Sequence, residues 1–217
     1  MNTQTKNKAI EHEVQQRGPE WFNLRLGRFT SSEFYKLMTE PRTTSYILEK
    51  AAEVLYNCPA PFAQNAALDW GTENEPLAVK AYQNITGRKI QNVGFVTLGK
   101  HTGTSPDGYT NDGGLIEIKC PYNRLNHLQN ILNVNSADDL KKHSKQYYYQ
   151  IQHQLYITGR NWCEFVSFDP RLLTGDNWRF CTHIVRVPAN YEEHAIIKEK
   201  IKRGALLLES IINKMNI

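Results

Sequence analysis

The sequence has few cysteines and no long apolar run, and both absences exclude classes of protein. Its four cysteines (Cys58, Cys120, Cys163 and Cys181) include no C-x-x-C pair, so neither a zinc site nor a thioredoxin-like redox motif is indicated. Three of the four stand in apolar, strand-like surroundings, as is typical of a reduced intracellular protein. No apolar stretch approaches the ~20 residues of a membrane span, and residues 1–16 lack the apolar segment of a signal peptide. We therefore expect a cytoplasmic protein with no membrane partner.

The chain also has little net charge, no internal repeat and no low-complexity segment. Its 26 lysines and arginines against 22 acidic residues leave a charge of +4, which permits a nucleic-acid partner without indicating one. A length of 217 residues with 40% apolar content suits one domain with a sizeable core. We expect residues 1–217 to form a single domain in which the polar first 16 residues are flexible.

Apolar periodicity predicts a mixed α/β (α+β) fold with one central mixed sheet flanked by helices. The expected helices span 21–26, 31–38, 45–56, 66–85, 147–158 and 191–213. The expected strands span 90–98, 115–120, 162–168 and 180–187, with a polar, partly helical connection over 122–145. Thr30 to Glu33 has the pattern of a capping box, and Thr44 can cap the third helix. Gly71 and Pro76 predict a kink or a break in the fourth helix.

The stretch from Gly103 to Pro121 carries the clearest chemical signal. It predicts two short strands joined by a turn, the first ending near Asp107 and the second running over 115–120. Glu117 and Lys119 are two residues apart, so on a strand they point to the same face, and Asp107 arrives beside them from the neighbouring strand. Two carboxylates and one ammonium would form a hard, oxygen-rich site suited to Mg²⁺.

A simpler interpretation of this stretch stays open. S-P-D-G is a common turn, and Glu117 and Lys119 could lie on a solvated strand face. The apolar residues Leu115, Ile116 and Ile118 favour a site, because they predict a central strand on which charged side chains need a partner or a metal. The Cys-Pro pair that follows ends the strand abruptly and leaves Lys119 where a site can open.

Three further patterns could add to such a site. Glu75, on a helix whose other face is apolar, is either a surface glutamate or the third carboxylate that a divalent-metal site needs. Arg25, Ser32 and the free N–H groups of a helix start could bind a phosphate, or could be a surface arginine and a plain N-cap. Gln150 lies on a tyrosine-rich helix with His153, where a lone histidine is more often structural than catalytic.

These patterns occur in an order that resembles a known family. The chain is similar to the phage lambda exonuclease family, the YqaJ-type viral recombinases of the PD-(D/E)-x-K nuclease superfamily, in the ordered set W-x-x-x-R-x-G-x-x-T-[SA]-S, W-G-x-x-x-E, S-P-D-G, E-[IL]-K-C-P, Q-x-Q and D-P-R. A PD-(D/E)-x-K match alone has low specificity, whereas the ordered set, over residues 17–190, is highly specific. The resemblance implies a restriction-endonuclease-like core, a mixed sheet flanked by helices.

The resemblance also implies roles for residues of the central stretch and its neighbours. Asp107 and Glu117 look like the metal-binding acids, and Lys119 looks like the catalytic lysine. Glu75 matches the helical glutamate that adds to the family's metal site, and the carbonyl of Ile118 would be a further metal ligand.

Further residues match the family's water and phosphate contacts. Gln150 is similar in placement to a catalytic glutamine that helps to hold the attacking water. Arg25, Ser32 and Ser105 match a pocket for the 5′-phosphate of the strand being digested. Residues outside these motifs depart from the family, so the 58–64 loop receives no strand-separating role and the 122–145 connection no DNA contact.

The activity implied by the resemblance is a 5′-to-3′ exonuclease that acts on double-stranded DNA with two Mg²⁺ ions per site, for which Mn²⁺ can substitute. It releases mononucleotides and leaves a 3′ single-stranded tail for phage recombination by strand annealing. The implied partners are a DNA end with a 5′-phosphate, two further copies of the chain in a trimeric ring, and a single-strand annealing protein in the host cytoplasm. Two alternatives stay open: a structure- or sequence-specific endonuclease on the same core, and a non-catalytic DNA-binding module.

Overall fold

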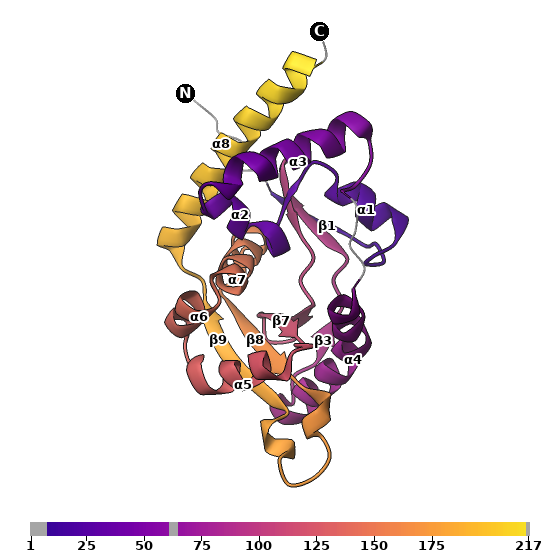
Figure 1. Cartoon of the computed structure of the whole chain (residues 1–217), viewed down its shortest axis with the longest axis vertical. Coiled ribbons are helices and arrows are strands. Elements are labelled where there is room, and N and C mark those ends of the chain that lie inside the picture. Colours follow the sequence, from indigo (N-terminus) through magenta and orange to yellow (C-terminus); the bar gives the residue numbers. More distant parts are fainter. Residues whose placement is uncertain (1–7, 61–64, 216–217) are drawn as a thin grey trace.

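The computed structural model describes residues 8–60 and 65–215 (Figure 1). Its helices are α1 (Pro19–Arg25), α2 (Tyr35–Met38), α3 (Arg42–Tyr56), α4 (Ala66–Thr86), α5 (Arg124–Asn133), α6 (Ala137–His143), α7 (Lys145–Thr158) and α8 (Tyr191–Met215), with 3₁₀ turns η1 (Ser31–Glu33), η2 (Pro170–Leu172) and η3 (Trp178–Phe180). Its strands are β1 (Ala9–His12), β2 (Phe29–Thr30), β3 (Ile90–Gln91), β4 (Phe95–Leu98), β5 (Thr102–Thr104), β6 (Gly108–Thr110), β7 (Leu115–Lys119), β8 (Trp162–Phe168) and β9 (Thr182–Pro188). No helix in these ranges has the length and apolar character needed to cross a membrane.

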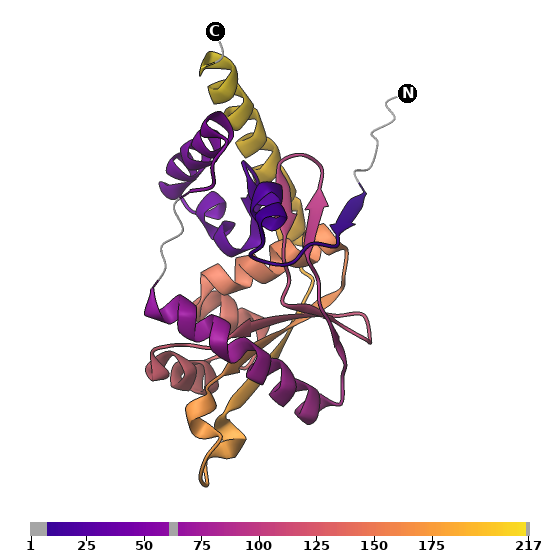
Figure 2. The same ribbon diagram turned by 90° about the vertical axis from the view of Figure 1, so that its right-hand side faces the viewer.

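The strands form two sheets, and the chain passes between them twice near the candidate site. One sheet has the order β1-β4-β5-β2 and the other the order β3-β6-β7-β8-β9 (Figure 1, Figure 2). β7 and β8 run parallel, whereas β6–β7 and β8–β9 are antiparallel. The mixed fold class is confirmed, but its strands divide between two sheets, and the strand expected over 90–98 is β3 and β4 in different sheets. Residues 92–94 and 105–107 make the two crossings, and Asp107 ends the second.

Successive side chains of β7 face different helices. Leu115 packs in the core cluster that includes α7, whereas Ile116 and Ile118 pack in the cluster that includes α4. α7 and α4 therefore cover opposite faces of the five-stranded sheet. Because side chains alternate along a strand, Glu117 and Lys119 share the face of Leu115 and point toward α7.

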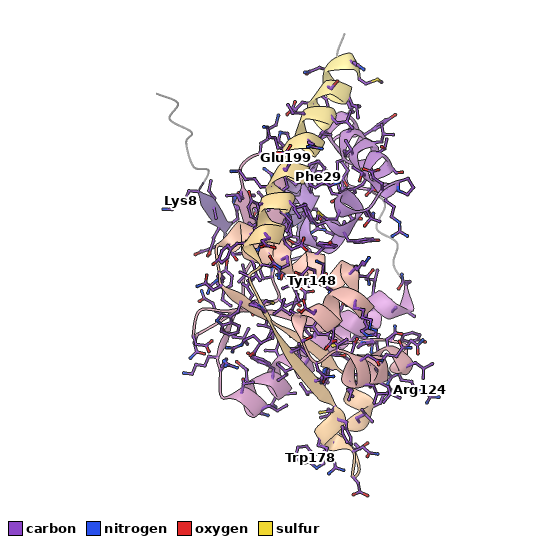
Figure 3. The ribbon with its side chains drawn as sticks, turned by 90° about the vertical axis from the view of Figure 1, so that its left-hand side faces the viewer. Lys8, Phe29, Arg124, Tyr148, Trp178 and Glu199 are labelled. Carbon is purple, nitrogen blue, oxygen red and sulfur yellow. The ribbon has the colours of Figure 1, made fainter. Side chains whose placement is uncertain are left out.

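A third cluster packs α8 against α2 and α3 around Phe29. The approach is close at Gly204, where an added Cβ would lie 3.0 Å from the Phe29 ring. Figure 3 shows Phe29 beside α8, and the exposed Trp178 near the opposite end of the molecule. This layer fixes the segment that runs from the end of α1, at Arg25, to α2 and carries Ser32.

The two expected helix caps are absent, so these predictions were wrong. Residues 31–33 form the turn η1 before α2, and the Thr30 hydroxyl accepts a hydrogen bond from Arg25 (3.4 Å) instead of capping a helix. α3 begins at Arg42, so Thr44 lies inside it. Thr30 does not cap the helix because its hydroxyl accepts a hydrogen bond from Arg25 of α1, and not from a backbone N–H of the turn that follows it.

Other segments are more regular than expected. α4 continues without a break through Gly71 and Pro76. The 122–145 connection contains the two helices α5 and α6, and the last strand begins at Thr182 because η3 precedes it. Residues 9–12, expected to be flexible, pair with β4 as an edge strand. That strand depends on a neighbour more than eighty residues away, which local patterns do not reveal.

Candidate active site

The candidate site forms where β6 no longer pairs with β7. The ladder between them ends at Gly108 opposite Ile116. Asp107 takes the place of the missing strand, because its Oδ2 accepts the Ile118 N–H at 2.6 Å. The N–H and C=O of a strand residue point to the same side, so the Ile118 carbonyl also faces this opening. Asp107 therefore directly precedes a strand, whereas the sequence suggested that it ends one.

Glu117 is 1% exposed, and both of its carboxylate oxygens accept hydrogen bonds. Oε1 accepts from Lys119 Nζ (2.5 Å) and from Gln150 Nε2 (2.7 Å), and Oε2 accepts from Gln154 Nε2 (2.5 Å). The side-by-side placement expected for Glu117 and Lys119 is present, and α7 supplies two amides. Gln154 was not among the expected site residues. Its spacing of four from Gln150, which puts both on one helix face, was the available signal.

Lys119 lies between carboxylates and an aromatic ring. Its ammonium is 5.0 Å from the centre of the Tyr147 ring. Burial by itself lowers the pKa of Lys119, but the carboxylates of Glu117 and Asp107 outweigh it and raise the pKa above its ordinary value. In this arrangement Lys119 is a charged donor.

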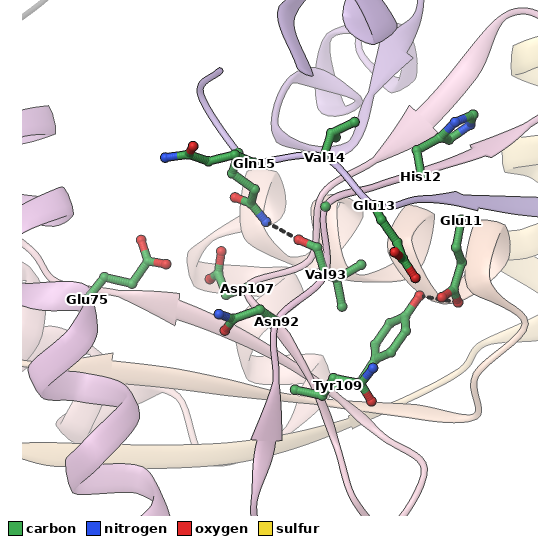
Figure 4. Close-up of a pocket in the computed structure, with 13 residues that line it drawn as sticks. Glu11, His12, Glu13, Val14, Gln15, Glu75, Asn92, Val93, Asp107 and Tyr109 are labelled. Carbon is green, nitrogen blue, oxygen red and sulfur yellow. Dashed lines mark hydrogen bonds between the residues drawn. The ribbon is translucent and has the colours of Figure 1, made fainter. Parts of the chain in front are cut away.

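Glu75 and Asp107 line a cavity of about 680 Å³ between the N-terminal segment and the crossings. Figure 4 shows their carboxylates turned toward each other. Burial, and then the carboxylates of Glu117 and Glu75, raise the pKa of Asp107 well above its usual range. Burial also raises the pKa of Glu75, although the Arg17 guanidinium opposes the shift. The cavity thus holds carboxyl groups whose charge Arg17 and Lys119 offset only in part.

The residues around this opening fit a hard divalent cation. Carboxylates with raised pKa values gain from a bound cation, and carboxylate and carbonyl oxygens are the ligands that Mg²⁺ prefers. Within residues 8–60 and 65–215, no three His, Cys, Asp or Glu side chains stand together as a complete metal site. The reason is that Glu117 is turned toward Lys119 and α7 on one face of β7, whereas Glu75 comes from α4 on the other. Glu75 and Asp107 line the cavity, and the Ile118 carbonyl lies at the edge of β7 beside Asp107.

Two of the three residues expected to hold a phosphate, Arg25 and Ser105, contact Trp21. The Arg25 guanidinium lies 4.2 Å above the Trp21 ring. The indole N–H donates to Ser105 Oγ (2.5 Å), which itself donates to the carbonyl of Gly94 (2.8 Å). Ser32 is exposed in η1. The structure thus brings Arg25 and Ser105 together through Trp21, but the Ser105 hydroxyl hydrogen is already donated and is not free for a phosphate.

His153 connects this region to α7. Its ring nitrogens make hydrogen bonds with the hydroxyls of Ser31 and Thr102, each at 2.8 Å, and the ring stacks on Phe34 at 3.8 Å. Burial, with a smaller contribution from His194, lowers the pKa of His153 to about 3. A ring that is neutral and fully bonded in the core is a structural histidine, in line with the simpler interpretation of the sequence.

Comparison with known proteins identifies the family. A family model described as the YqaJ-like viral recombinase domain matches residues 20–161. The chain belongs to this YqaJ-like family. The assignment made from the ordered motifs is thereby confirmed. The matched range of the YqaJ-like domain contains every candidate site residue but ends before the D-P-R pattern at 169–171.

Several known proteins resemble this YqaJ-like chain. LHK-Exo, an alkaline exonuclease from Laribacter hongkongensis, is 33% identical with a TM-score of 0.80 over 92% of this chain and 96% of that chain. Its complex with dAMP matches with the same identity and TM-score over 91% of this chain and 96% of that chain. A phage-related exonuclease from Haemophilus somnus 129PT, at 17% identity and a TM-score of 0.71 over 87% of this chain and 96% of that chain, shares the fold. Protein R354 of Acanthamoeba polyphaga mimivirus is 27% identical over 71% of this chain, which spans only 29% of that longer protein.

Proposed function

We propose that this YqaJ-like chain is a metal-dependent 5′-to-3′ deoxyribonuclease that digests one strand of linear double-stranded DNA. The observation that carries the proposal is the cluster of Asp107, Glu117 and Lys119 at the open edge of β7. The similarity to an alkaline exonuclease over 92% of the chain supports digestion from an end. The products would be mononucleotides and a 3′ single-stranded tail suited to recombination by strand annealing.

Two Mg²⁺ ions, or Mn²⁺ in their place, would be held by Asp107, Glu75, Glu117 and the Ile118 carbonyl. Bound divalent cations supply a water that is nucleophilic near neutral pH and stabilise the leaving 3′-oxygen. The donor set supports this assignment, because all four donors are hard oxygen atoms and two of them, Asp107 and Glu75, line the same cavity.

Lys119 and Gln150 would handle the attacking water. The Lys119 ammonium has three N–H donors, of which Glu117 takes one, so two remain for the water or the scissile phosphate. If bound cations neutralised the charges of Glu117 and Asp107, burial would be the dominant influence on the pKa of Lys119. That pKa would then fall, and the amine could accept the proton of the water. Gln150 would hold the water from the α7 side, next to the oxygen of Glu117 that it already contacts.

A 5′-phosphate held by Arg25 and Ser32 would explain the polarity of digestion. Burial lowers the pKa of the Arg25 guanidinium, which stays charged and has few solvent contacts to lose on binding an anion. Ser105 would act in the pocket by holding Trp21 under Arg25, since its own hydrogen is donated to Gly94. An anchored terminal phosphate would place the first phosphodiester bond over the acids.

The proposed partners are those that the resemblance to the phage lambda exonuclease family implies. We propose a trimeric ring of this chain around the DNA, and a single-strand annealing protein that receives the 3′ tail. The host cytoplasm, where DNA and Mg²⁺ are present, is the proposed location.

The deciding experiment is digestion of a linear duplex labelled at either 5′ or 3′ end, with Mg²⁺, beside a covalently closed circle of the same sequence. We expect release of 5′-labelled mononucleotides from linear DNA, faster from 5′-phosphate than from 5′-hydroxyl ends, and no cutting of the circle. Cleavage of the circle would favour an endonuclease, and no Mg²⁺-dependent product from either substrate would leave a non-catalytic DNA-binding module. Equal rates on the two kinds of 5′ end would overturn the phosphate pocket.

A further inference from the structure

The Arg171 guanidinium binds three partners just beyond the candidate site, one carboxylate and two backbone carbonyls. It follows β8, and its guanidinium donates to Asp169 through Nε (2.7 Å) and Nη2 (2.6 Å). Nη1 and Nη2 also donate to the carbonyls of Tyr122 (3.1 Å) and Pro121 (3.2 Å). Burial alone would raise the pKa of the 3%-exposed Asp169, but the bonds from Arg171 hold it below its ordinary value. Arg171 and Asp169 therefore form a specific ion pair with a buried carboxylate, not an incidental surface pair.

The same guanidinium also contacts α4. It lies 4.9 Å from the centre of the Trp70 ring, and Trp70 meets the ring of Tyr122 edge-on at 6.1 Å. Trp70 stands five residues before Glu75 on this continuous helix. The Arg171 guanidinium therefore links the end of β8, the residues that follow β7 and the helix that carries Glu75.

The contact matters because, beyond Ile116, β7 is paired with a strand on one side only. Its pairing with β6 stops at Ile116, so Lys119 is held in the sheet on one side, opposite Ser167 of β8. The carbonyls bound by Arg171 belong to the second and third residues after Lys119. A planar fork with five donors can serve a carboxylate, two carbonyls and a ring at once, which a lysine ammonium cannot.

We propose that Arg171 is a positioning residue of the metal site: it sets Glu75 on α4 against Glu117 and Lys119 on β7. The inference rests on the proposed function, because it assigns Arg171 to the same cation site. The bonds of Arg171 reach none of the three proposed metal-binding acids, so it would act through the backbone after β7 and through Trp70. It is the arginine of the D-P-R pattern and lies outside the range matched by the YqaJ-like domain.

The test is Arg171→Lys, which keeps the charge and removes the fork. We expect the Mg²⁺ concentration for half-maximal cleavage to rise about tenfold, in the range seen when an outer support of a metal site is lost. Mg²⁺ binding measured by calorimetry on the full chain without DNA should weaken by a similar factor. This second readout does not depend on turnover.

Arg186→Lys is a matched control on the neighbouring strand. Arg186 also pairs with a buried carboxylate, Glu164 (2.9 Å), and also lies over a tryptophan, Trp162 (3.9 Å), but contacts neither α4 nor the end of β7 in these bonds. Substituting Arg186 by lysine therefore removes the same kind of guanidinium contact, to a carboxylate and to a ring, as the Arg171 variant. We expect a comparable fall in melting temperature with unchanged Mg²⁺ dependence.

The outcomes separate the two proposals. If wild-type chain neither binds Mg²⁺ nor digests DNA, the proposed function fails. If wild type does both and Arg171→Lys needs the same Mg²⁺ as Arg186→Lys, the positioning role of Arg171 is overturned while the nuclease stands. If Arg171→Lys does not fold, Trp70→Leu decides: it leaves the Asp169 pair intact, and an unchanged Mg²⁺ affinity in this variant overturns the inference.

Discussion

Glu117 is, at the scale of single residues, a buried carboxylate on which both stability and the proposed chemistry would depend. It accepts from Lys119, Gln150 and Gln154, so each oxygen has at least one donor. A buried acceptor left without a donor costs about 1–3 kcal/mol. Substituting one donor therefore has an effect on folding and a separate effect on the reaction, which matched variants can resolve.

Lys119→Ala should abolish cleavage while DNA binding is retained. The substitution removes the ammonium that Glu117 accepts from, and we expect cleavage to fall by about 10²–10⁴-fold or more, as for loss of a proton-transfer group. Single-turnover digestion of labelled duplex and fluorescence anisotropy with Ca²⁺ measure the two properties. Turnover near the wild-type rate with Mg²⁺ in excess would show that Lys119 is not catalytic.

Gln154→Met should lower both stability and activity. The residue keeps a similar volume but leaves Glu117 Oε2 without its donor, so we expect a loss of about 1–3 kcal/mol in the free energy of unfolding. We also expect cleavage to fall by about 10–100-fold. Gln152→Met is the control, because Gln152 is buried on the same helix and donates to the Pro188 carbonyl (2.9 Å), away from the acids. A loss of activity as large in the control would assign the effect to the helix as a whole.

His153→Gln should make the stability of the chain less sensitive to acid. The folded-state pKa of about 3 lies below the value of ~6.5 expected in the unfolded chain, so the unfolded state binds more protons below pH 6.5. The contribution of His153 is complete above pH 6.5 and is lost at about 1.4 kcal/mol per pH unit as the pH falls from 6.5 toward 3. Denaturant titrations at pH 7 and pH 5 should show a drop smaller by about 2 kcal/mol in the variant. Equal drops would mean that the histidine titrates normally.

The crossings between the two sheets matter most at the scale of elements. Residues 92–94 and 105–107 run side by side, and the Gln16 amide donates to the carbonyls of Val93 (2.7 Å) and Pro106 (3.1 Å). Gly94 is the tight point, because an added Cβ would lie 2.4 Å from the His12 carbonyl oxygen. The position of Asp107 thus depends on a backbone contact with the N-terminal strand.

Gly94→Ala should destabilise the fold by about 1–3 kcal/mol, as expected for overpacking against atoms that cannot rotate away. Gly71→Ala is the control within α4, where an added Cβ meets no atom within 4 Å. It should stabilise the chain by about 0.5–1 kcal/mol, since glycine is unfavourable inside a helix. Chemical denaturation measures both. Equal effects of the two substitutions would show that the backbone around residue 94 can shift to accept a Cβ with no loss of stability.

At the scale of the whole molecule, a net charge of +4 is modest for the DNA-digesting protein proposed above. A ring of several copies would concentrate basic side chains around the duplex and keep the enzyme on its substrate. The same assembly would place one active site on each copy and restrict the duplex to a single path.

The proposed ring predicts a solution mass three times that of a single chain. Light scattering coupled to gel filtration measures it directly, and the mass should stay constant across micromolar concentrations. A mass equal to one chain under these conditions would exclude the ring and leave the nuclease proposal in place, since the candidate acids all come from a single chain.

Much of the fold and of the site was predictable because the signals are local. The i, i+2 spacing of Glu117 and Lys119 holds on any strand, and the long apolar periodicity of α8 appears as expected. Residues 9–12, Gln154 and Arg171 could not be placed in this way. Each acquires its role from a partner more than thirty residues away, and one sequence without a structure does not show which distant segments meet.

The sequence by itself determined the family, the mixed fold class and which side chains stand next to one another on one strand. These follow from residue order and from the fixed geometry of strands and helices. Only the tertiary structure decided that the strands split into two sheets and that Asp107, in place of a strand, accepts the Ile118 N–H. It also decided that the Ser105 hydroxyl donates to the Gly94 carbonyl. The physical reason is that most buried donors and acceptors are paired, and that pairing is settled among segments brought together by folding.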